Sequence, residues 1–211
     1  MSGSVSLPRS SVFVLASASQ ARASLLHHAG VGLRLFPSDV DEDALKARLV
    51  ERGHGGGVIA RRLAEEKALD VSVRVNDALV IGGDQTLVQG ARLFSKAVDR
   101  SDAIQTLATL SGREHALHSA YAFAWRGRLV SSGVESATLR LRSLDKDEII
   151  QYVDAVGPTV YKSVGCYQIE ALGRGLFAEI DGDHSTILGL PLTPVLGFLR
   201  AWSEGGRTVS C

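Results

Sequence analysis

The chain has 211 residues, enough for one large domain or two small lobes with a substantial hydrophobic core. Its 23 basic and 23 acidic residues leave no net charge, so the composition offers no electrostatic footprint for duplex nucleic acid or an anionic membrane. Two cysteines do not make a disulfide framework, and the N-terminal apolar run is too short to span a bilayer or serve as a secretion signal. We therefore expect a soluble cytoplasmic protein with no nucleic-acid or membrane partner.

The first predicted elements are a buried strand over residues 12–16 and a helix over about 20–29. Ser17 and Ser19 lie at their junction, and Arg22 follows within the first helical turn. Because the free amides of a first turn attract anions, these three side chains could form a phosphate cradle. The serines are equally typical of ordinary helix caps, and both interpretations stay open.

An acidic stretch follows a short predicted strand over 33–36. Four carboxylates, Glu42 among them, fall within residues 39–43. Such a cluster is either a solvated loop or a binding site for a divalent cation, and spacing alone does not separate the two. The glycines of segment 54–57 then predict a flexible loop.

A helix is predicted over about 58–73, with an apolar stripe through Ala60, Ala64 and Val71. Lys67 falls on this stripe at helical spacing, which is unusual for a lysine. It could extend past its apolar neighbours into solvent, or point into an anion-binding cleft.

The stretch Ala78–Lys96, ALVIGGDQTLVQGARLFSK, is the centre of the predicted site. Its apolar run over 78–81 predicts a strand buried on both faces, and Gly82-Gly83 would then let the backbone turn or approach a ligand closely. Asp84 would be delivered at the carboxyl end of a core strand, where open α/β sheets bind ligands and where Mg²⁺ needs a carboxylate beside substrate phosphates. A plain turn between two strands is the alternative.

The remaining chain alternates strands with helices. His115 and His118, three apart on a predicted strand, should point to opposite faces and be structural. We predict strands over 86–88, 93–94, 115–125, 128–141 and 176–180, helices over 103–110, 144–155 and from about 192 to Trp202, and a glycine-rich segment, 157–175, carrying Glu170.

Several of these segments together resemble one family, the Maf-type nucleoside triphosphate pyrophosphatases. The resemblance runs from about Phe13 to Arg200, and the motifs keep their order. The matching motifs are LASASQAR over 15–22 with Leu25-Leu26, RLAEEKA over 62–68, GGDQ over 82–85, Lys96, LSGREH over 110–115 and GLPL over 189–192.

The resemblance implies a mixed α/β fold with an extended twisted sheet, in which residues 1–211 form a single domain of two lobes around one central cleft, with a homodimer as a possible assembly. The implied activity is hydrolysis of a nucleoside triphosphate to the monophosphate and pyrophosphate. It also implies a divalent metal cofactor, Mg²⁺, Mn²⁺ or Co²⁺.

Carried over position by position, the resemblance implies that Ser17, with its neighbour Ser19, and Arg22 bind phosphate. Lys67 and Lys96 would neutralise the triphosphate, since phosphoryl transfer is catalysed chiefly by positioning and charge stabilisation.

Asp84 is the catalytic acid residue that the resemblance implies, and Glu42 would help it bind the metal. Asp84 would either orient the attacking water or deprotonate it.

Two positions bear on which nucleobase the substrate carries. Gln85 and Glu170 are more similar to the 7-methyl-GTP branch of the family than to the thymidine- and uridine-triphosphate branch. A carboxylate can accept two hydrogen bonds from guanine and complements the positive charge of a methylated guanine. The alternatives are a dTTP/UTP pyrophosphatase, a nucleotide-binding regulator of septum formation without turnover, or a domain that binds another phosphorylated metabolite.

The chain also departs from the family pattern. Gln20-Ala21 replaces the usual Pro-Arg, so one arginine is missing, and a common later lysine falls at Ser163, with Lys162 one place away. The sequence assigns no role to Cys166.

Overall fold

The structure, a computed structural model, describes residues 12–75 and 77–205. Residues 1–11, which contributed to the prediction that there is no secretion signal, lie outside these ranges. Cys211 does so as well. The strands are β1 (Val12–Leu15), β2 (Leu33–Leu35), β3 (Ala78–Gln89), β4 (Arg92–Leu93), β5 (Glu114–Trp125), β6 (Arg128–Leu141) and β7 (Phe177–Asp181). The helices are α1 (Gln20–His28), α2 (Glu42–Glu51), α3 (Gly56–Ser72), α4 (Arg100–Leu110), α5 (Lys146–Val156), α6 (His184–Ile187) and α7 (Leu192–Ser203), with 3-10 helices η1 (Gly157–Lys162) and η2 (Leu172–Leu176).

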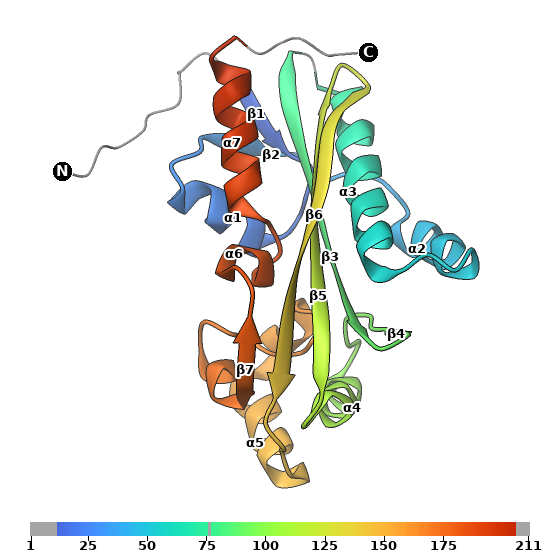
Figure 1. Cartoon of the computed structure of the whole chain (residues 1–211), viewed down its shortest axis with the longest axis vertical. Coiled ribbons are helices and arrows are strands. Elements are labelled where there is room, and N and C mark those ends of the chain that lie inside the picture. Colours follow the sequence, from blue (N-terminus) through green and yellow to red (C-terminus); the bar gives the residue numbers. More distant parts are fainter. Residues whose placement is uncertain (1–11, 76, 206–211) are drawn as a thin grey trace, which may run out of the picture. The chain divides into compact units, whose positions relative to one another are not determined.

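Within the described residues these strands form one open, mixed sheet of seven strands in the order β2-β1-β3-β5-β6-β7, with β4 paired to β3 (Figure 1). β1 runs parallel to both β2 and β3, whereas β4 and β7 pair antiparallel with their neighbours. The predicted α/β class is confirmed. None of the helices described is both long and apolar enough to cross a membrane.

The chain divides into two compact units. Unit 1 comprises the described residues of Met1–Gln85, Ser119–Glu135 and Asp183–Cys211; unit 2 comprises Thr86–His118 and Ser136–Gly182. The single domain of two lobes around a cleft stays a prediction, and each unit is described by itself.

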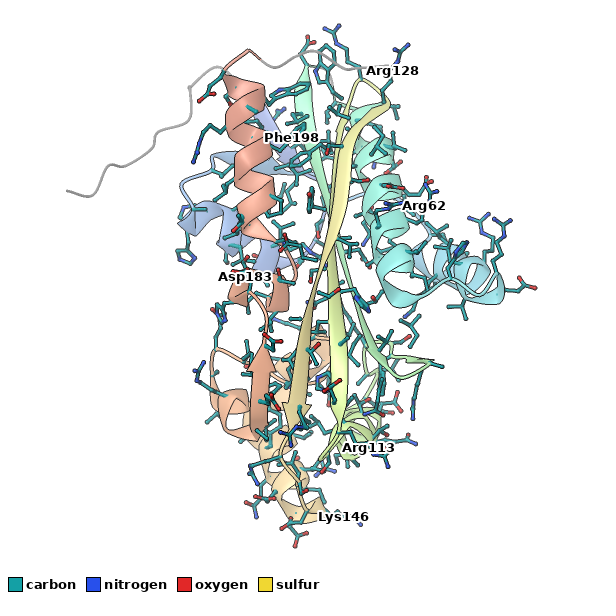
Figure 2. The ribbon with its side chains drawn as sticks, viewed as in Figure 1. Arg62, Arg113, Arg128, Lys146, Asp183 and Phe198 are labelled. Carbon is teal, nitrogen blue, oxygen red and sulfur yellow. The ribbon has the colours of Figure 1, made fainter. Side chains whose placement is uncertain are left out.

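In unit 1, helices cover both faces of the sheet because successive strand residues point to opposite sides. On one face α3 packs its alanines against Val14, Val80 and the alanines of β5. On the other face α1 and α7 cover Leu15, Ile81 and Phe123. Phe198 of α7, which is labelled in Figure 2, stacks on Phe123, with ring centroids 4.0 Å apart. The strands are apolar on both faces, as the run over 78–81 predicts.

The Gly82-Gly83 pair is not a turn, so the prediction that β3 ends there is wrong. β3 continues as a strand to Gln89, and Asp84 lies within it. The parallel pairing with β1 nevertheless stops at Ile81. A Cβ on Gly82 would lie 2.1 Å from the Ala64 carbonyl oxygen, so glycine is required because α3 packs directly on the strand.

Two helix assignments near the acidic stretch also differ from prediction. Segment 54–57 was predicted to be a loop, yet α3 begins at Gly56. No element was predicted for residues 44–51, and they form most of α2. Asp41 caps this helix by accepting a hydrogen bond from the Ala44 amide at 2.9 Å. Glu42 is therefore the first residue of a helix.

Unit 2 contains α4, α5 and the two 3-10 helices, which contact one another, together with the remaining strand segments. Arg100 of α4 donates two hydrogen bonds to Asp154 of α5, at 2.7 and 2.9 Å. His115 is buried and shares a 2.9 Å hydrogen bond with the Tyr167 hydroxyl, while His118 bonds Ser136. The two histidines have separate hydrogen-bond partners within unit 2, and their predicted structural role agrees with these contacts.

Candidate active site

The centre of the site in unit 1 is the carboxylate of Asp84. It accepts a hydrogen bond from the Lys67 ammonium at 2.7 Å, and both side chains are nearly buried, with 8% and 4% of each residue exposed. The same ammonium forms an ion pair of 2.6 Å with Glu42. Lys67 therefore does not extend into solvent; it joins two carboxylates that come from different elements.

The fold brings these three residues together by simple means. Lys67 lies on α3 between Ala64 and Ala68, and these two alanines pack directly on Gly82 of β3, two residues before Asp84. Glu42 reaches the same point from the start of α2, a helix that packs on α3. The sequence features that predicted this were the lysine on an apolar stripe and the acid after the glycine pair.

Arg22 is the second cation of the site and is also buried. Its Nε donates to the Gly189 carbonyl oxygen at 2.8 Å, and its Nη1 donates to Ser17 Oγ at 3.1 Å. Burial lowers the pKa of the Arg22 guanidinium, and the nearby carboxylates of Asp84 and Glu42 oppose that shift. Arg22 is thus held rigidly beside the acidic pair.

The two serines organise this arginine. Ser19 is the N-cap of α1 and accepts the Arg22 amide at 3.4 Å, so the ordinary-cap interpretation holds for Ser19. Ser17 Oγ accepts both the Ser19 amide, at 3.2 Å, and the Arg22 guanidinium. A hydroxyl that accepts two hydrogen bonds still has its own proton to donate, so a phosphate contact by Ser17 is compatible with this geometry. Direct phosphate binding by either serine stays a prediction.

The carboxylates of the acidic stretch 39–43 have different partners. They neither form one solvated loop nor gather at a single cation site. Asp39 pairs with Arg74 at the surface, at 2.5 Å, and Asp41 caps α2. Glu42 alone among these carboxylates is placed by the structure against the Lys67 ammonium. Spacing could not separate these roles because they depend on where α2 begins.

Lys46 is a candidate residue of the active site that was not predicted from the sequence. It lies one turn after Glu42 on α2 and is half-buried. Burial lowers the pKa of the Lys46 ammonium, and the charges of Asp84 and Asp43 raise it. Lys46 therefore lies within electrostatic range of the central carboxylate. The i, i+4 spacing to Glu42 was the available signal, but it is informative only once the helix is known.

Gln85 has a structural task in addition to the predicted one. Its Nε2 donates to Ser119 Oγ at 2.9 Å and to the carbonyl oxygens of Thr186 and Ile187 at 3.2 and 2.9 Å. The two carbonyl acceptors belong to α6, whose N-cap is Asp183 (Figure 2), and Ser119 belongs to β5. The amide of Gln85 thus ties β3 to the segment that leads to Gly189, the partner of Arg22. Contact between Gln85 and substrate stays a prediction.

The donor set fits a divalent cation that is completed by substrate. Glu42 and Asp84 direct one oxygen each at the same Lys67 nitrogen, so the two oxygens are no farther apart than the sum of those short distances. Residues 12–75 and 77–205 contain no group of three His, Cys, Asp or Glu side chains that could hold a metal alone. Mg²⁺ is typically held by one or two carboxylates together with water and substrate phosphates, and this pair can supply such a set.

Comparison with known proteins places the chain in a family. The family model described as Maf-like protein matches residues 12–202. The chain belongs to the Maf-like family. A protein of Rhodopseudomonas palustris (strain BisB5) named nucleoside triphosphate pyrophosphatase is 49% identical over 188 residues, covering 89% of this chain and 92% of the relative.

Two further relatives extend this comparison. A protein of Nitrobacter winogradskyi with the same name is 47% identical over 191 residues, covering 89% of this chain and 92% of the relative. A protein of Rhizobium etli named 7-methyl-GTP pyrophosphatase is 42% identical over 187 residues, covering 89% of this chain and 94% of the relative.

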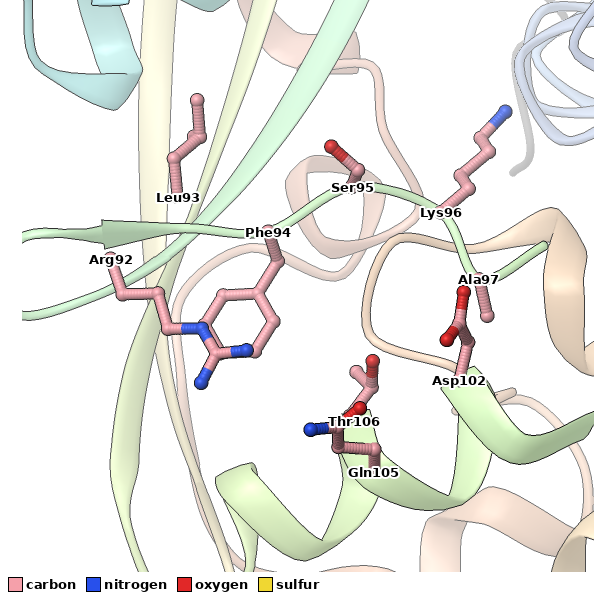
Figure 3. A pocket seen from close by; sticks show the side chains of 9 residues that line it. All are labelled: Arg92, Leu93, Phe94, Ser95, Lys96, Ala97, Asp102, Gln105 and Thr106. Carbon is pink, nitrogen blue, oxygen red and sulfur yellow. The ribbon is translucent and has the colours of Figure 1, made fainter. Parts of the chain in front are cut away.

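Two residues singled out by the Maf resemblance belong to unit 2. Lys96 is exposed after β4 and lines a cavity of about 210 Å³ with residues of α4, among them Gln105 and Thr106 (Figure 3). In Figure 3 its ammonium points away from those two side chains. Glu170 is exposed just before η2. The roles of Lys96 and Glu170 stay predictions.

The segment before Glu170 is tightly held within unit 2. Ser163 Oγ donates to the Tyr167 carbonyl oxygen at 2.9 Å, so this serine, at the position of the usual lysine, has a local structural contact. Cys166 is buried with a φ of 55°, and burial raises the pKa of its thiol. A buried thiol with a raised pKa is a poor nucleophile, which favours a packing role.

Proposed function

We propose that this protein hydrolyses a nucleoside triphosphate to the nucleoside monophosphate and pyrophosphate with the help of a divalent cation. The observation that carries the proposal is the buried Asp84–Lys67 pair, whose ammonium also pairs with Glu42, beside Arg22. The names of the relatives support the reaction, since those at 49% and 47% identity are called nucleoside triphosphate pyrophosphatases.

In this reaction a water attacks the α-phosphorus, the bond to the bridging oxygen of the β-phosphate breaks, and pyrophosphate leaves. Glu42 and Asp84 would hold the cation, which would supply Lewis-acid stabilisation of the phosphate oxygens. The second task of Asp84 is to orient the attacking water or accept its proton. Its burial suits either task because electrostatic interactions are stronger where bulk water is excluded.

The cations of unit 1 would bind the triphosphate tail. Arg22 is pre-organised by Ser17 and Gly189, so little conformational entropy is lost when it contacts a phosphate. Lys67 and Lys46 provide mobile point charges. Lys96 is also proposed to neutralise the triphosphate, as the Maf resemblance implies.

For the base, we propose a guanine-type nucleotide, with 7-methyl-GTP as the leading candidate. Glu170 supports this choice because a carboxylate complements the donors of guanine and the charge of its methylated form. The relative named 7-methyl-GTP pyrophosphatase, at 42% identity, supports it as well. A dTTP/UTP pyrophosphatase is the alternative.

A panel of nucleoside triphosphates tests the proposal. The wild-type protein is incubated with GTP, 7-methyl-GTP, dTTP and UTP, with Mg²⁺, with Mn²⁺ and with EDTA, and pyrophosphate is measured. We expect metal-dependent pyrophosphate release with the fastest turnover on 7-methyl-GTP. Binding without release would favour a regulator, fastest turnover on dTTP or UTP would favour the alternative enzyme, and no interaction with any of them would refute the proposal.

A further inference from the structure

Lys67 occupies the place where the two proposed metal ligands converge. Its Nζ lies 2.6 Å from Glu42 Oε2 and 2.7 Å from Asp84 Oδ1. Only 4% of Lys67 and 8% of Asp84 are exposed, so bulk water is largely excluded from their contact, whereas the Glu42 side chain is about half exposed. One oxygen of each carboxylate, Glu42 Oε2 and Asp84 Oδ1, is therefore already paired with an ammonium.

An ammonium and a divalent cation cannot use the same oxygens at the same time. Both are positively charged, and at a separation of a few ångströms beside the nearly buried Asp84 they repel strongly. A cation coordinated by these same two oxygens therefore requires the Lys67 ammonium to move away. Binding of the cation and displacement of Lys67 are therefore coupled.

The side chains of the site differ in their ability to move. Arg22 is fixed by hydrogen bonds to a backbone carbonyl oxygen and to Ser17. Both ion-pair partners of Lys67 are carboxylates, and a lysine has a flexible four-carbon stem with a compact charge. Lys67 can exchange one set of anionic oxygens for another without disturbing the backbone of α3.

We propose that Lys67 is an internal substitute for the metal, which occupies the site until a cation arrives with its nucleotide. The ammonium keeps Glu42 and Asp84 together and lowers their affinity for a free cation. When a nucleotide brings both the cation and its phosphates, Lys67 leaves the carboxylates and pairs with phosphate oxygens. The cation and the nucleotide consequently bind cooperatively, and this second half of the exchange rests on the proposed function.

Direct binding of Mn²⁺ in the absence of nucleotide tests the first half. Electron paramagnetic resonance measures free Mn²⁺ in titrations of the wild type and of Lys67→Met, with circular dichroism as the folding control. We expect Lys67→Met to bind Mn²⁺ about tenfold more tightly or better, the equivalent of one charge-assisted hydrogen bond. The double variant Lys67→Met/Asp84→Asn should lose this gain.

Lys46→Met is the matched control because it removes a positive charge that acts on Asp84 from a neighbouring position. Its gain in Mn²⁺ affinity should be smaller than that of Lys67→Met. Equal gains would show that only the overall charge matters, and no gain in Lys67→Met would show that the ammonium does not compete. Either result overturns the proposal.

A second measurement on the wild type covers the case in which Lys67→Met does not fold. Reductive methylation followed by mass spectrometry compares Lys67 with the exposed Lys146, with and without saturating Mn²⁺. We expect Mn²⁺ to raise labelling of Lys67 alone; unchanged labelling overturns the proposal. Neither experiment needs turnover, so a protein that exchanges Lys67 for Mn²⁺ but releases no pyrophosphate would refute only the proposed function.

Discussion

Replacing Gly82 by alanine should destabilise the protein through one identifiable contact. The added Cβ would lie 2.1 Å from the Ala64 carbonyl oxygen and 3.0 Å from the Ala68 Cβ. To restore ordinary contact, α3 must move away from β3 by roughly 1.4 Å, because non-bonded atoms normally lie at about 3.5 Å or more. Overpacking of this kind costs about 3 kcal/mol at the upper end of the usual range. The gain of roughly 0.5–1 kcal/mol from replacing a strand glycine by alanine is smaller.

Gly83→Ala is the matched comparison. Its Cβ would meet the Arg22 side chain, at 3.0 Å from Cδ, rather than backbone. A side chain can rotate, so we expect a loss of stability of about 1 kcal/mol or less. Arg22 would be displaced, and pyrophosphate release should fall on the order of 10- to 100-fold, as for a shift of about 1 Å in a positioning group.

Urea unfolding and thermal melts of the wild type and both variants check this pair. After the gain of roughly 0.5–1 kcal/mol is subtracted, the net loss of about 2–2.5 kcal/mol lowers the Tm of a chain of this size by roughly 4–10 °C. Gly82→Ala should show that decrease and Gly83→Ala should not. If Gly82→Ala unfolds at the same urea concentration as the wild type, the close packing of α3 on β3 is refuted.

Three further predictions follow from single residues. Burial lowers the pKa of His115 to about 4 from an unfolded value near 6.5, so its stabilising contribution is complete above pH 6.5 and is lost as the pH falls to 4. Urea unfolding at several pH values measures this contribution. Between pH 6.5 and 4 the free energy of unfolding should fall by about 3 kcal/mol less in His115→Gln than in the wild type, and identical pH profiles would contradict this assignment. Glu170→Gln should shift the ratio of kcat/KM values away from guanine-type nucleotides, and an unaltered substrate ranking removes Glu170 from the base site. Lys46→Met should raise KM for the triphosphate about tenfold, the loss of about 1.4 kcal/mol of electrostatic binding, whereas an exposed lysine such as Lys146 should be neutral on replacement; equal KM values in both variants would argue against a role for Lys46.

The spacing of apolar and polar residues predicted those elements whose formation depends mainly on neighbouring residues in the sequence. The apolar run over 78–81 predicted a central strand because only a strand covered on both faces tolerates such a sequence. The helical spacing of Lys67 with Ala60 and Ala64 predicted that it faces inward. The helix predicted over 144–155 is α5, which Asp145 caps with a complete capping box.

The predictions that were wrong or missing concern residues whose roles depend on segments distant in the sequence. Gly82 and Gly83 predict a turn in isolation, but here glycine serves the approach of α3 and Arg22 to the two sides of β3. Helix α2 was missed because its apolar periodicity is weak, so Glu42 was assigned to an acidic stretch instead of a helix start. The anchoring role of Gln85 depends on α6, about 100 residues later in the chain, as the 101- and 102-residue separations of its bonds show.

The account depends on Asp84 more than on any other residue, and pyrophosphate release by Asp84→Asn tests it most directly. Asparagine has nearly the same shape but no charge, so the variant should fold while losing its hold on the cation and the attacking water. With 7-methyl-GTP and Mg²⁺ we expect turnover to fall at least 10³-fold, on the order of what loss of a central electrostatic group costs, while the exposed-site control Asp147→Asn keeps wild-type activity. An Asp84→Asn protein that is folded and turns over at the wild-type rate would contradict the central claim.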